Sequence, residues 1–442
     1  MPDWVQDAIW WHVYPLGATG AFPHPDPAGD GSRLLRLLPW LDHVVELGAN
    51  GLLLGPVFAS STHGYDTVDH FRIDPRLSTE EDFDRLVAAC RERGLRLLLD
   101  GVFNHVGREH PAFRAVLREG AAAPAAGWFR LRWPAGDGPG AVPVHDDFEG
   151  HSDLVALDHA NPAVTDLVVD VMTHWLARGA DGWRLDAAYA VPPERWAPVL
   201  TRVRERFPDA YVVGEVIHGD YPTTVAASGM DSVTQYELWK AVWSSLNDTN
   251  LHELAWTLQR HDALLETFAP FTFVGNHDVT RIASRLDDER HLPHAVAVLM
   301  TVGGTPAVYA GDEHAFRGVK EERAGGDDAV RPPLPPTPAD LSPLGLPTFH
   351  LHQQLIGLRR RHRWLHRART TVLHVENARL VLESRAADGE GRLLLALDLT
   401  GTGGELPAPG ASAVLAGAGE LRGGPDGGRV LLPPHGWAVL AG

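Results

Sequence analysis

The chain has 442 residues, of which 44% are hydrophobic, and a formal net charge of −18. This length suits one large α/β barrel or two to three domains of ordinary size. The negative charge argues against nucleic acids and anionic membranes as partners, because both bind basic surfaces. The one cysteine, Cys90, can form no internal disulfide and gives no Cys/His zinc spacing.

The beginning of the chain carries no pattern of a secretory signal. Asp3 and Asp7 precede the first apolar run, and no basic segment stands before it. No run of 18 uninterrupted apolar residues occurs, which predicts that the chain has no transmembrane helix. We therefore expect a cytoplasmic, reduced protein.

Apolar runs and helical patterns alternate through the first 364 residues. The runs that predict strands are 8–16, 51–58, 95–105, 182–187, 210–216, 231–237, 271–278 and 305–313. Apolar residues at helical spacing predict helices at 33–48, 79–93, 163–178, 193–206, 237–263, 291–302 and 348–364. Residues 315–347 are rich in Gly, Pro and Asp and are predicted to form a long loop.

The number and order of these elements predict a (β/α)8 TIM barrel with parallel strands. An open doubly wound sheet is the alternative, but the segment after the first strand lacks the glycine pattern of dinucleotide-binding folds. Residues 106–160 break the repeat and predict a short inserted lobe after the third strand. The barrel then comprises 1–105 and 161–368, and short alternating strands in 369–442 predict a small C-terminal all-β domain, a β-sandwich.

Charged residues gather where the predicted strands end. Arg184 and Asp186 are two residues apart, so their side chains leave the same face of a strand, whereas Trp183 and Leu185 point to the opposite face, into the core. Active sites of parallel barrels lie at the carboxyl ends of the strands, so one rim should hold all such residues. The others are His63, Tyr65, Asp66, Asp100, Asn104, His105, Glu215, Asn276, His277 and Asp278.

Carboxylates on three separate strands suit cleavage of a glycosidic bond, which needs one ionised carboxylate to attack the anomeric carbon and one protonated carboxyl for the leaving oxygen. Arg184 should favour the ionised form of Asp186, which makes Asp186 the predicted nucleophile. Glu215 has no cation near it in the sequence, so burial should keep it protonated as the proton donor. Asp278 is expected to hold substrate hydroxyls and to stabilise charge on the sugar ring.

Hydrolysis at a metal ion is a competing interpretation. The side chains that offer suitable ligand atoms are His63, Asp66, His105, His277 and Asp278. The chain contains no H-E-x-x-H pattern, so we prefer the glycosidase interpretation and expect no metal ligand in the active site.

Six short segments carry a family resemblance. In chain order they are HGYD (63–66), DGVFNH (100–105), GWRLDAA (182–188), GEV (214–216), FVGNHD (273–278) and GDE (311–313). The second to the fifth match the four principal motifs of the α-amylase family of glycoside hydrolases, family 13, on the expected strands. The sequence resembles the oligosaccharide-acting, intracellular branch of that family from residue 8 to about residue 365.

This resemblance implies Asp186 as the nucleophile, Glu215 as the acid/base and Asp278 as the transition-state stabiliser, with retention of the anomeric configuration. The substrate-binding residues that it implies are Tyr65, Asp100, His105, Arg184 and His277. The expected function is a retaining glycoside hydrolase, of the α-glucosidase or α-amylase type, that forms a covalent intermediate. The expected partner is a small α-glucoside or a maltodextrin, and the oligomeric state is left open.

Two departures from the family bear on cofactors. Tyr189 and Ala190 stand where many members have Lys-His, and the insert lacks an acidic cluster. We therefore expect that no cofactor is required. A structural calcium ion remains an alternative, although Asn104 alone does not make a calcium site.

Two other functions fit the same motifs. A transglycosidase, isomerase or phosphorylase would use a sugar or phosphate in place of water as the acceptor. A non-catalytic carbohydrate-binding protein on this scaffold would usually lack one of the three carboxylates, and this chain has all of them.

The chain has 14 tryptophans, and aromatic rings can serve as core residues or as flat platforms for sugars. Trp10, Trp11 and Trp183 are predicted to lie in the core. The candidates for sugar platforms, which lie in or near rim loops, are Trp128, Trp133 and Trp239.

Overall fold

Eight parallel strands form a barrel. The computed structural model describes residues 1–23, 31–134, 136–323, 325–423 and 427–442. The barrel strands are hydrogen-bonded in the order β13-β12-β11-β5-β2-β1-β15-β14, and a parallel bridge between Thr234 and Phe271 joins the two ends. Their bounds are β1 (Trp10–Val13), β2 (Gly51–Leu54), β5 (Arg96–Gly101), β11 (Gly182–Leu185), β12 (Tyr211–Gly214), β13 (Ser232–Val233), β14 (Phe271–Phe273) and β15 (Thr305–Tyr309). The predicted (β/α)8 fold is confirmed.

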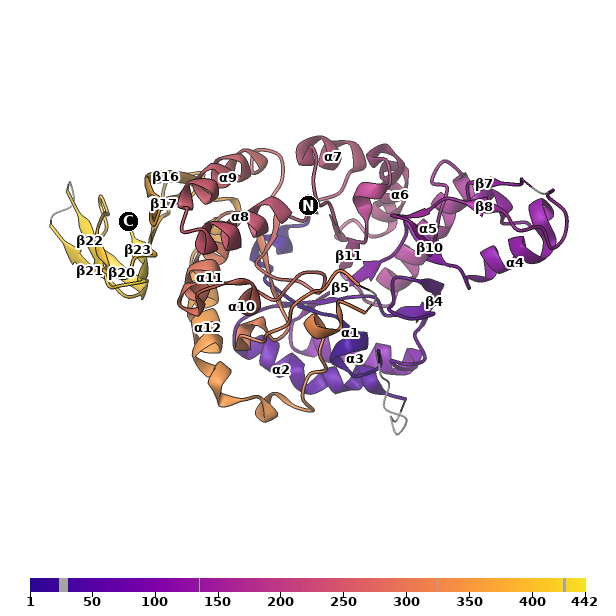
Figure 1. The fold of residues 1–442 in the computed structure, drawn as a ribbon, viewed down its shortest axis with the longest axis horizontal. Helices are drawn as coiled ribbons and strands as arrows, with labels where there is room; N and C mark the ends of the chain where they lie inside the picture. The colour runs from indigo at the N-terminus through magenta and orange to yellow at the C-terminus, as the bar shows by residue number, and fades with distance from the viewer. Residues whose placement is uncertain (24–30, 135, 324, 424–426) are drawn as a thin grey trace.

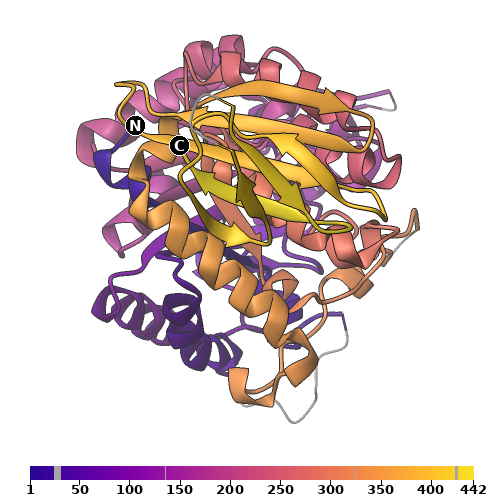
Figure 2. The ribbon, with the colours of Figure 1, turned by 90° about the vertical axis from the view of Figure 1, so that its left-hand side faces the viewer.

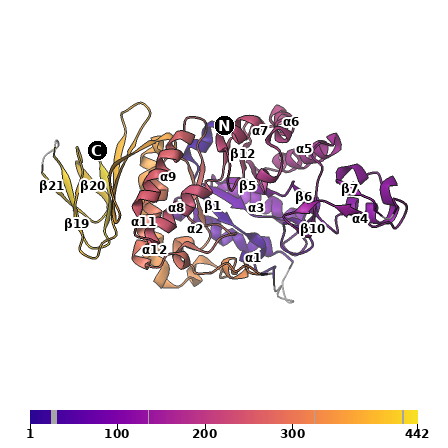
Figure 3. The same cartoon turned by 45° about the horizontal axis from the view of Figure 1, so that its top comes forward.

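Helices cover the outside of the barrel (Figures 1 and 3). The longer ones are α2 (Leu38–Leu47), α3 (Glu80–Glu92), α5 (Pro162–Ala177), α6 (Pro193–Arg206), α8 (Tyr236–Asn247), α9 (Leu251–Leu264), α11 (Leu292–Thr301) and α12 (Leu346–Arg361). Shorter helices are α1 (Pro15–Ala18), α7 (Tyr221–Ser228) and α10 (Ile282–Arg285). Among the described residues, no helix has the length and apolar character needed to cross a membrane.

The helix predicted at 237–263 is in fact two helices, α8 and α9. Between them, Thr249 has a φ of 48°, and the Asn250 side chain accepts a hydrogen bond from the His252 N–H. A left-handed residue interrupts an α-helix, and asparagine is a favoured N-cap, so the chain turns here. The apolar pattern continues across the break, which is why the sequence predicted a single helix.

Side chains of the strands alternate between the barrel interior and the layer beneath the helices. Trp10 points inward and stacks on Tyr211, whereas Trp11 points outward and stacks on Trp40. Trp183 packs in the outer layer, on the opposite face of its strand from the rim residues. All three tryptophans predicted for the core are fully buried.

Two additions lie at opposite ends of the molecule (Figure 1). The insert contains α4 (Pro111–Glu119), β6 (His105–Gly107), β7 (Leu131–Arg132), β8 (Val144–His145), β9 (Asp147–Phe148) and β10 (His151–Ala156). Beside it, β3 (Phe58–Ser60) pairs with β4 (Thr67–Ile73). These elements extend the rim of the barrel on one side.

The C-terminal strands form two sheets (Figure 2). The five-stranded sheet contains β16 (Arg369–Glu376), β17 (Arg379–Arg385), β18 (Arg392–Asp398), β20 (Ala413–Gly417) and β23 (Trp437–Ala441). The three-stranded sheet contains β19 (Gly404–Pro407), β21 (Glu420–Arg422) and β22 (Arg429–Leu432). Val381 and Leu394 from the first sheet share an apolar cluster with Leu406 and Val430 from the second, which is the packing of a β-sandwich.

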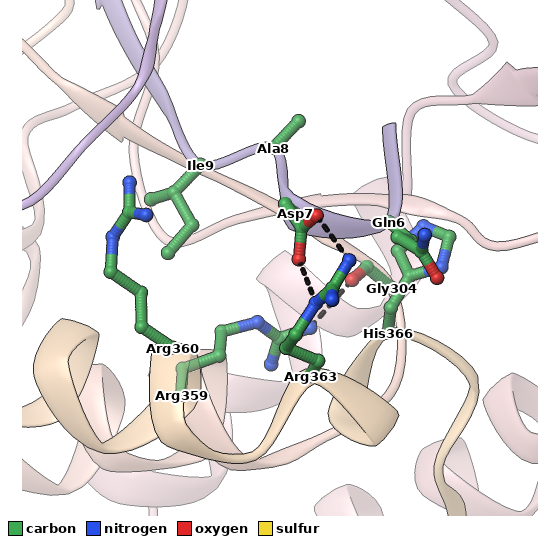
Figure 4. A pocket seen from close by; sticks show the side chains of 9 residues that line it. All are labelled: Gln6, Asp7, Ala8, Ile9, Gly304, Arg359, Arg360, Arg363 and His366. Carbon is green, nitrogen blue, oxygen red and sulfur yellow. Dashed lines mark hydrogen bonds and ion pairs between the residues drawn. The ribbon is translucent and has the colours of Figure 1, made fainter. Parts of the chain in front are cut away.

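The amino ends of the barrel strands border a basic pocket of about 170 Å³ (Figure 4). Arg359 of α12 is buried there, and its guanidinium donates to three backbone carbonyls at distances of 2.6 to 3.0 Å. Burial lowers the pKa of Arg359 to about 9. Arg363 is more exposed and forms two contacts with Asp7, at 2.5 and 2.6 Å.

Candidate active site

Arg184 connects the ends of three neighbouring strands. It lies in β11, in register with Asp100 of β5 and Val213 of β12. Its Nη1 donates to both Asp100 oxygens at 2.8 Å and to Asp186 Oδ1 at 3.1 Å, and its Nη2 lies 2.5 Å from Glu215 Oε1. All four side chains are buried. The structure therefore brings these predicted site residues into one hydrogen-bonded cluster.

Three further predicted residues join this cluster from other strands. The Tyr65 hydroxyl donates to Asp100 Oδ2 at 3.2 Å and is in close contact with His277 Nε2. The same His277 nitrogen lies 3.0 Å from Asp278 Oδ2. The rings of Tyr65 and His277 are stacked, with centroids 5.6 Å apart. Tyr65 comes from the β3–β4 loop and the other two follow β14, so the cluster draws on widely separated segments.

His105 supports the site through the backbone of Tyr65. Its Nε2 lies 3.0 Å from the Tyr65 carbonyl oxygen, and its ring stacks on Phe148 of the insert. Burial lowers the pKa of His105 to about 4, so the ring is neutral near pH 7. This residue positions the tyrosine loop against the insert.

Glu215 has a cation beside it, which corrects the expectation from the sequence. Besides Arg184, the Tyr236 hydroxyl donates to its Oε1 at 3.1 Å and the Ala187 N–H donates to its Oε2 at 3.0 Å. Tyr236 in turn accepts a hydrogen bond from Asn276 Nδ2 at 3.0 Å. Arg184 reaches Glu215 only because their strands are neighbours in the barrel, and sequence spacing does not show that.

The turn after β11 directs a backbone donor into the site. Ala187 has a φ of 44°, a left-handed conformation that costs a non-glycine residue about 1 kcal/mol. This conformation follows Asp186 directly and aims the Ala187 N–H at Glu215. Strained backbone of this kind is typical of functional sites.

Asp186 differs from the sequence-based expectation in the direction of its pKa shift. Burial raises the pKa of Asp186 well above its usual range; Arg184 opposes this effect, and the neighbouring Glu215 and Asp100 reinforce it. Arg184 does favour the ionised form of Asp186, as expected, but burial and the neighbouring carboxylates outweigh it, so the expected lowering of the Asp186 pKa is wrong. Crowded carboxylates titrate together, so this cluster should hold a proton to a higher pH than separate, solvated carboxyls would. One protonated and one ionised carboxyl is the state that glycosidic cleavage requires.

Arg331 completes the site, and the sequence analysis missed it. Its Nη2 lies 2.5 Å from Asp278 Oδ1, its Nε donates to the His277 carbonyl at 2.8 Å, and its guanidinium lies over the Tyr14 ring. Burial would raise the pKa of Asp278, but His277 and Arg331 outweigh it and hold that pKa well below its usual range. Arg331 belongs to the segment predicted as a long loop, where no periodic pattern indicates its position.

The residues proposed as ligands of a catalytic metal do not form a ligand group. In the described part of the chain, two groups of three His, Asp or Glu residues bring ligand atoms within 4.8 Å of one another. Neither group includes His63, Asp66, His105, His277 or Asp278. His63 and Asp66 instead line a pocket of about 520 Å³ between the β3–β4 loop and the insert.

The three tryptophans proposed as sugar platforms are half-buried. Trp128 lies in the insert between α4 and β7, and Trp133 directly follows β7. Trp239 belongs to α8 and packs edge-on against Tyr236, with ring centroids 5.9 Å apart. Their contact with sugar stays a prediction.

Comparison with known proteins identifies the family to which this barrel and its rim of carboxylates belong. Residues 25–334 match the profile described as "Alpha amylase, catalytic domain". The chain belongs to the α-amylase family. It is therefore a glycoside hydrolase of the α-amylase type.

Relatives in this family extend the comparison. A cyclomaltodextrinase of Geobacillus thermopakistaniensis is 30% identical over 434 residues, which covers 92% of this chain and 71% of the relative. An intracellular maltogenic amylase of Bacillus subtilis (strain 168) is 29% identical over 72% of this chain. The match covers 57% of that relative, so the chain spans less than two thirds of its length.

Several similar solved structures were determined with a sugar ligand or inhibitor. The cyclic α-maltosyl-(1→6)-maltose hydrolase from Arthrobacter globiformis, in complex with cyclic α-maltosyl-(1→6)-maltose, has a TM-score of 0.81 and 25% identity to this chain. The match covers 100% of this chain and 99% of that structure. This α-amylase-family chain thus has the same overall architecture as that hydrolase.

Proposed function

We propose that the protein cleaves α-glucosidic bonds in small linear or cyclic α-glucans, with retention of the anomeric configuration. The observation that carries the proposal is the binding of Asp186 and Glu215 to the two terminal nitrogens of Arg184. Sharing one guanidinium keeps the two carboxyl groups close. Retaining glycosidases have such close pairs, whereas inverting enzymes leave space for a water molecule between them.

In this proposal Asp186 is the nucleophile and Glu215 is the acid/base. In the first step Glu215 acts as the acid and passes a proton to the leaving oxygen as the glycosidic bond breaks. Asp186 then forms the bond to the anomeric carbon. In the second step Glu215 takes a proton from water, whose oxygen displaces Asp186 from the sugar. Atoms and charges balance over the two steps.

The opposite side of the cluster stabilises the transition state. Asp278 is ionised because Arg331 and His277 lower its pKa, so it can face the positive charge that develops on the sugar ring. Tyr65 lies against His277, where its ring can support the sugar that is being cleaved. Arg331 then acts as a positioning residue, since it reaches the reaction through Asp278.

The expected substrates are maltodextrins and their cyclic forms. A pocket of about 520 Å³ lies between the β3–β4 loop and the insert, and its size is in the usual range for small-molecule sites. Its lining includes the polar residues Asp66, Arg108 and Asp153 but none of the three proposed catalytic carboxylates, so we assign it to sugar units away from the cleaved bond. One relative is named cyclomaltodextrinase, and the Arthrobacter globiformis hydrolase was solved with a cyclic maltose-based sugar. These names support a substrate of a few glucose units.

Cofactors and location are part of the same proposal. We expect full turnover without an added cofactor or calcium, and a cytoplasmic location, which the name of the intracellular maltogenic amylase supports. Treatment with EGTA should leave kcat at 25 °C unchanged. A loss of activity that calcium restores would contradict the calcium-free account.

A glycoside panel tests the proposal. The purified protein is incubated with maltose, maltotriose, isomaltose, trehalose, sucrose, β-cyclodextrin, pullulan and soluble starch, and the products are separated by chromatography. The Asp186→Asn variant is the matched control. Glucose or maltose released from one or more α-glucans, and absent in the control, is expected. Longer or rearranged sugars would instead indicate a transglycosidase, and no product with any sugar would contradict the proposal.

A further inference from the structure

Three buried side chains outside the active site bring atoms that could bind a metal ion close together. His43 lies in α2, and Glu313 and His314 lie in the 3₁₀ turn η7 (Asp312–His314) that follows β15. Their exposed fractions are 5%, 0% and 8%. One ligand atom from each lies within 4.8 Å of the other two. These residues occupy the outer layer of the barrel and are absent from the mechanism above.

Hydrogen bonds within the protein account for the burial of His43 and Glu313, but not for that of His314. His43 Nε2 lies 3.0 Å from Glu313 Oε1, and the Trp11 Nε1–H and the Gly311 N–H also donate to that carboxylate. His314 is different, because both of its ring nitrogens are buried without a hydrogen-bond partner among the described residues. Burying an imidazole in this way is unfavourable, and buried polar groups in native proteins nearly always have partners.

We propose that His43, Glu313 and His314 bind a divalent transition-metal ion, Zn²⁺ in the first instance. Imidazole and carboxylate ligands suit Zn²⁺, whereas Ca²⁺ and Mg²⁺ prefer sets of oxygen atoms. Tetrahedral Zn²⁺ holds its ligand atoms roughly 3.3 Å apart. The His43–Glu313 pair is already 3.0 Å apart, and His314 needs only a side-chain adjustment to reach the same point. Water supplies the fourth ligand.

Neighbouring groups hold Glu313 in place, as is common for residues that bind a metal ion. The two N–H donors on Glu313 fix its orientation, as hydrogen bonds around metal ligands commonly do. Metal ligands must be free of protons on the binding atom, so protons compete with the ion and affinity should fall as the pH is lowered. The ring planes of His43 and His314 lie within 26° of each other, and both rings contact Phe349 of α12.

The ion would have a structural role. It would join α2 to the turn after β15, next to Asp312, which pairs with the buried Arg281 at 2.7 Å. The same turn leads into the loop that carries Arg331. Binding to the folded state alone raises stability. The proposal is independent of the proposed function, because no ligand is a catalytic residue.

Metal analysis with matched variants tests this proposal. The full-length protein is stripped with EDTA, dialysed, and titrated with ZnSO₄; bound zinc is measured by mass spectrometry and the melting temperature by circular dichroism. His314→Gln and His43→Gln remove one ligand each. His435→Gln is the control, because it removes a ligand from the second group, formed by Asp288, His291 and His435. Co²⁺ binding is followed by its visible absorption.

We expect one tightly held Zn²⁺ per wild-type chain and a rise in the melting temperature of about 3 °C at saturating zinc. His314→Gln should lower the zinc affinity more than about tenfold and abolish both the thermal shift and the tetrahedral Co²⁺ absorption, whereas His435→Gln should retain them. No zinc retained by the wild type would overturn the proposal. Zinc binding that survives His314→Gln, or that is lost in His435→Gln alone, would also overturn it.

Discussion

The two ends of the barrel both bury arginines, but they neutralise the positive charge in different ways. At the carboxyl ends, Arg184 contacts three carboxylates whose protons can move. At the amino ends, Arg359 donates to three backbone carbonyls, whose dipoles are fixed; Figure 4 shows Arg359 beside one of the acceptors, Gly304. The first arrangement can exchange a proton with a substrate, whereas the second can only hold the chain together. Substitutions at the two ends should therefore affect different properties.

The largest effect on activity is expected for Asp186→Asn. Loss of the nucleophile should lower kcat by roughly 10⁴-fold or more. The same change should raise the melting temperature at pH 7. Because the folded-state pKa of Asp186 is raised, folding at a pH above the unfolded pKa of about 4 must return a proton to this carboxyl or bury its charge, which costs stability; the neutral amide removes that cost.

Turnover of maltotriose and thermal unfolding at pH 7 and pH 4 test this pair of effects. The stability gain should be present at pH 7 and small at pH 4. A variant that is less stable than the wild type at pH 7 would contradict the electrostatic account of the rim.

The largest effect on stability is expected at the other end, for Arg359→Met. Removing this guanidinium leaves three buried carbonyls without their donor, which should lower the free energy of unfolding by about 3 kcal/mol. Urea denaturation measures the change, and kcat/KM of the folded variant should stay near the wild-type value. Arg363→Gln is the control: its pair with Asp7 is exposed, so the denaturation midpoint should not move.

Arg331→Gln should change the pH dependence of catalysis. Asp278 must be ionised to act, and its low pKa depends partly on Arg331. Without that cation the pKa of Asp278 rises, so activity should be lost at a higher pH on the acid side, by about one pH unit. The kcat/KM profile between pH 4 and 8 measures this shift. In Arg331→Lys, which keeps a cation, the acid limb should return part of the way to its wild-type position. An acid limb that stays in place would show that Arg331 only holds its loop.

Tyr236→Phe should have the smallest effect. It removes one hydrogen bond to Glu215, worth about 1 kcal/mol, so kcat should fall about fivefold. Tyr211→Phe is the matched control, because it removes a buried tyrosine hydroxyl from β12 inside the barrel, where the Tyr211 ring stacks on Trp10. Equal losses in both variants would indicate a general effect on the barrel interior.

Local patterns were sufficient to predict most of the fold. Strands buried on both faces appear as continuous apolar runs, and signals such as Thr79 at the start of α3 and Gly48 at the end of α2 mark helix boundaries. The helix at 237–263 was predicted wrongly because its apolar spacing continues through Thr249, and only the backbone conformation of that residue ends α8.

The candidate site was predictable where its residues follow strands, and not elsewhere. Asp186 and Glu215 stand at strand ends, and parallel strands bring their carboxyl ends to one rim. Arg331 comes from an irregular segment whose path depends on packing over the whole barrel. The raised pKa of Asp186 comes from burial and from carboxylates on other strands, so a neighbouring arginine in the sequence was a poor guide to the direction of its shift.

Trapping the covalent intermediate tests the central claim most directly. The wild-type protein is incubated with 5-fluoro-α-D-glucosyl fluoride, digested with a protease, and its peptides are analysed by mass spectrometry. The account predicts one fluoroglucosyl adduct per chain, on Asp186. An adduct on Glu215, or turnover of α-glucans with inversion and without any adduct, would contradict it.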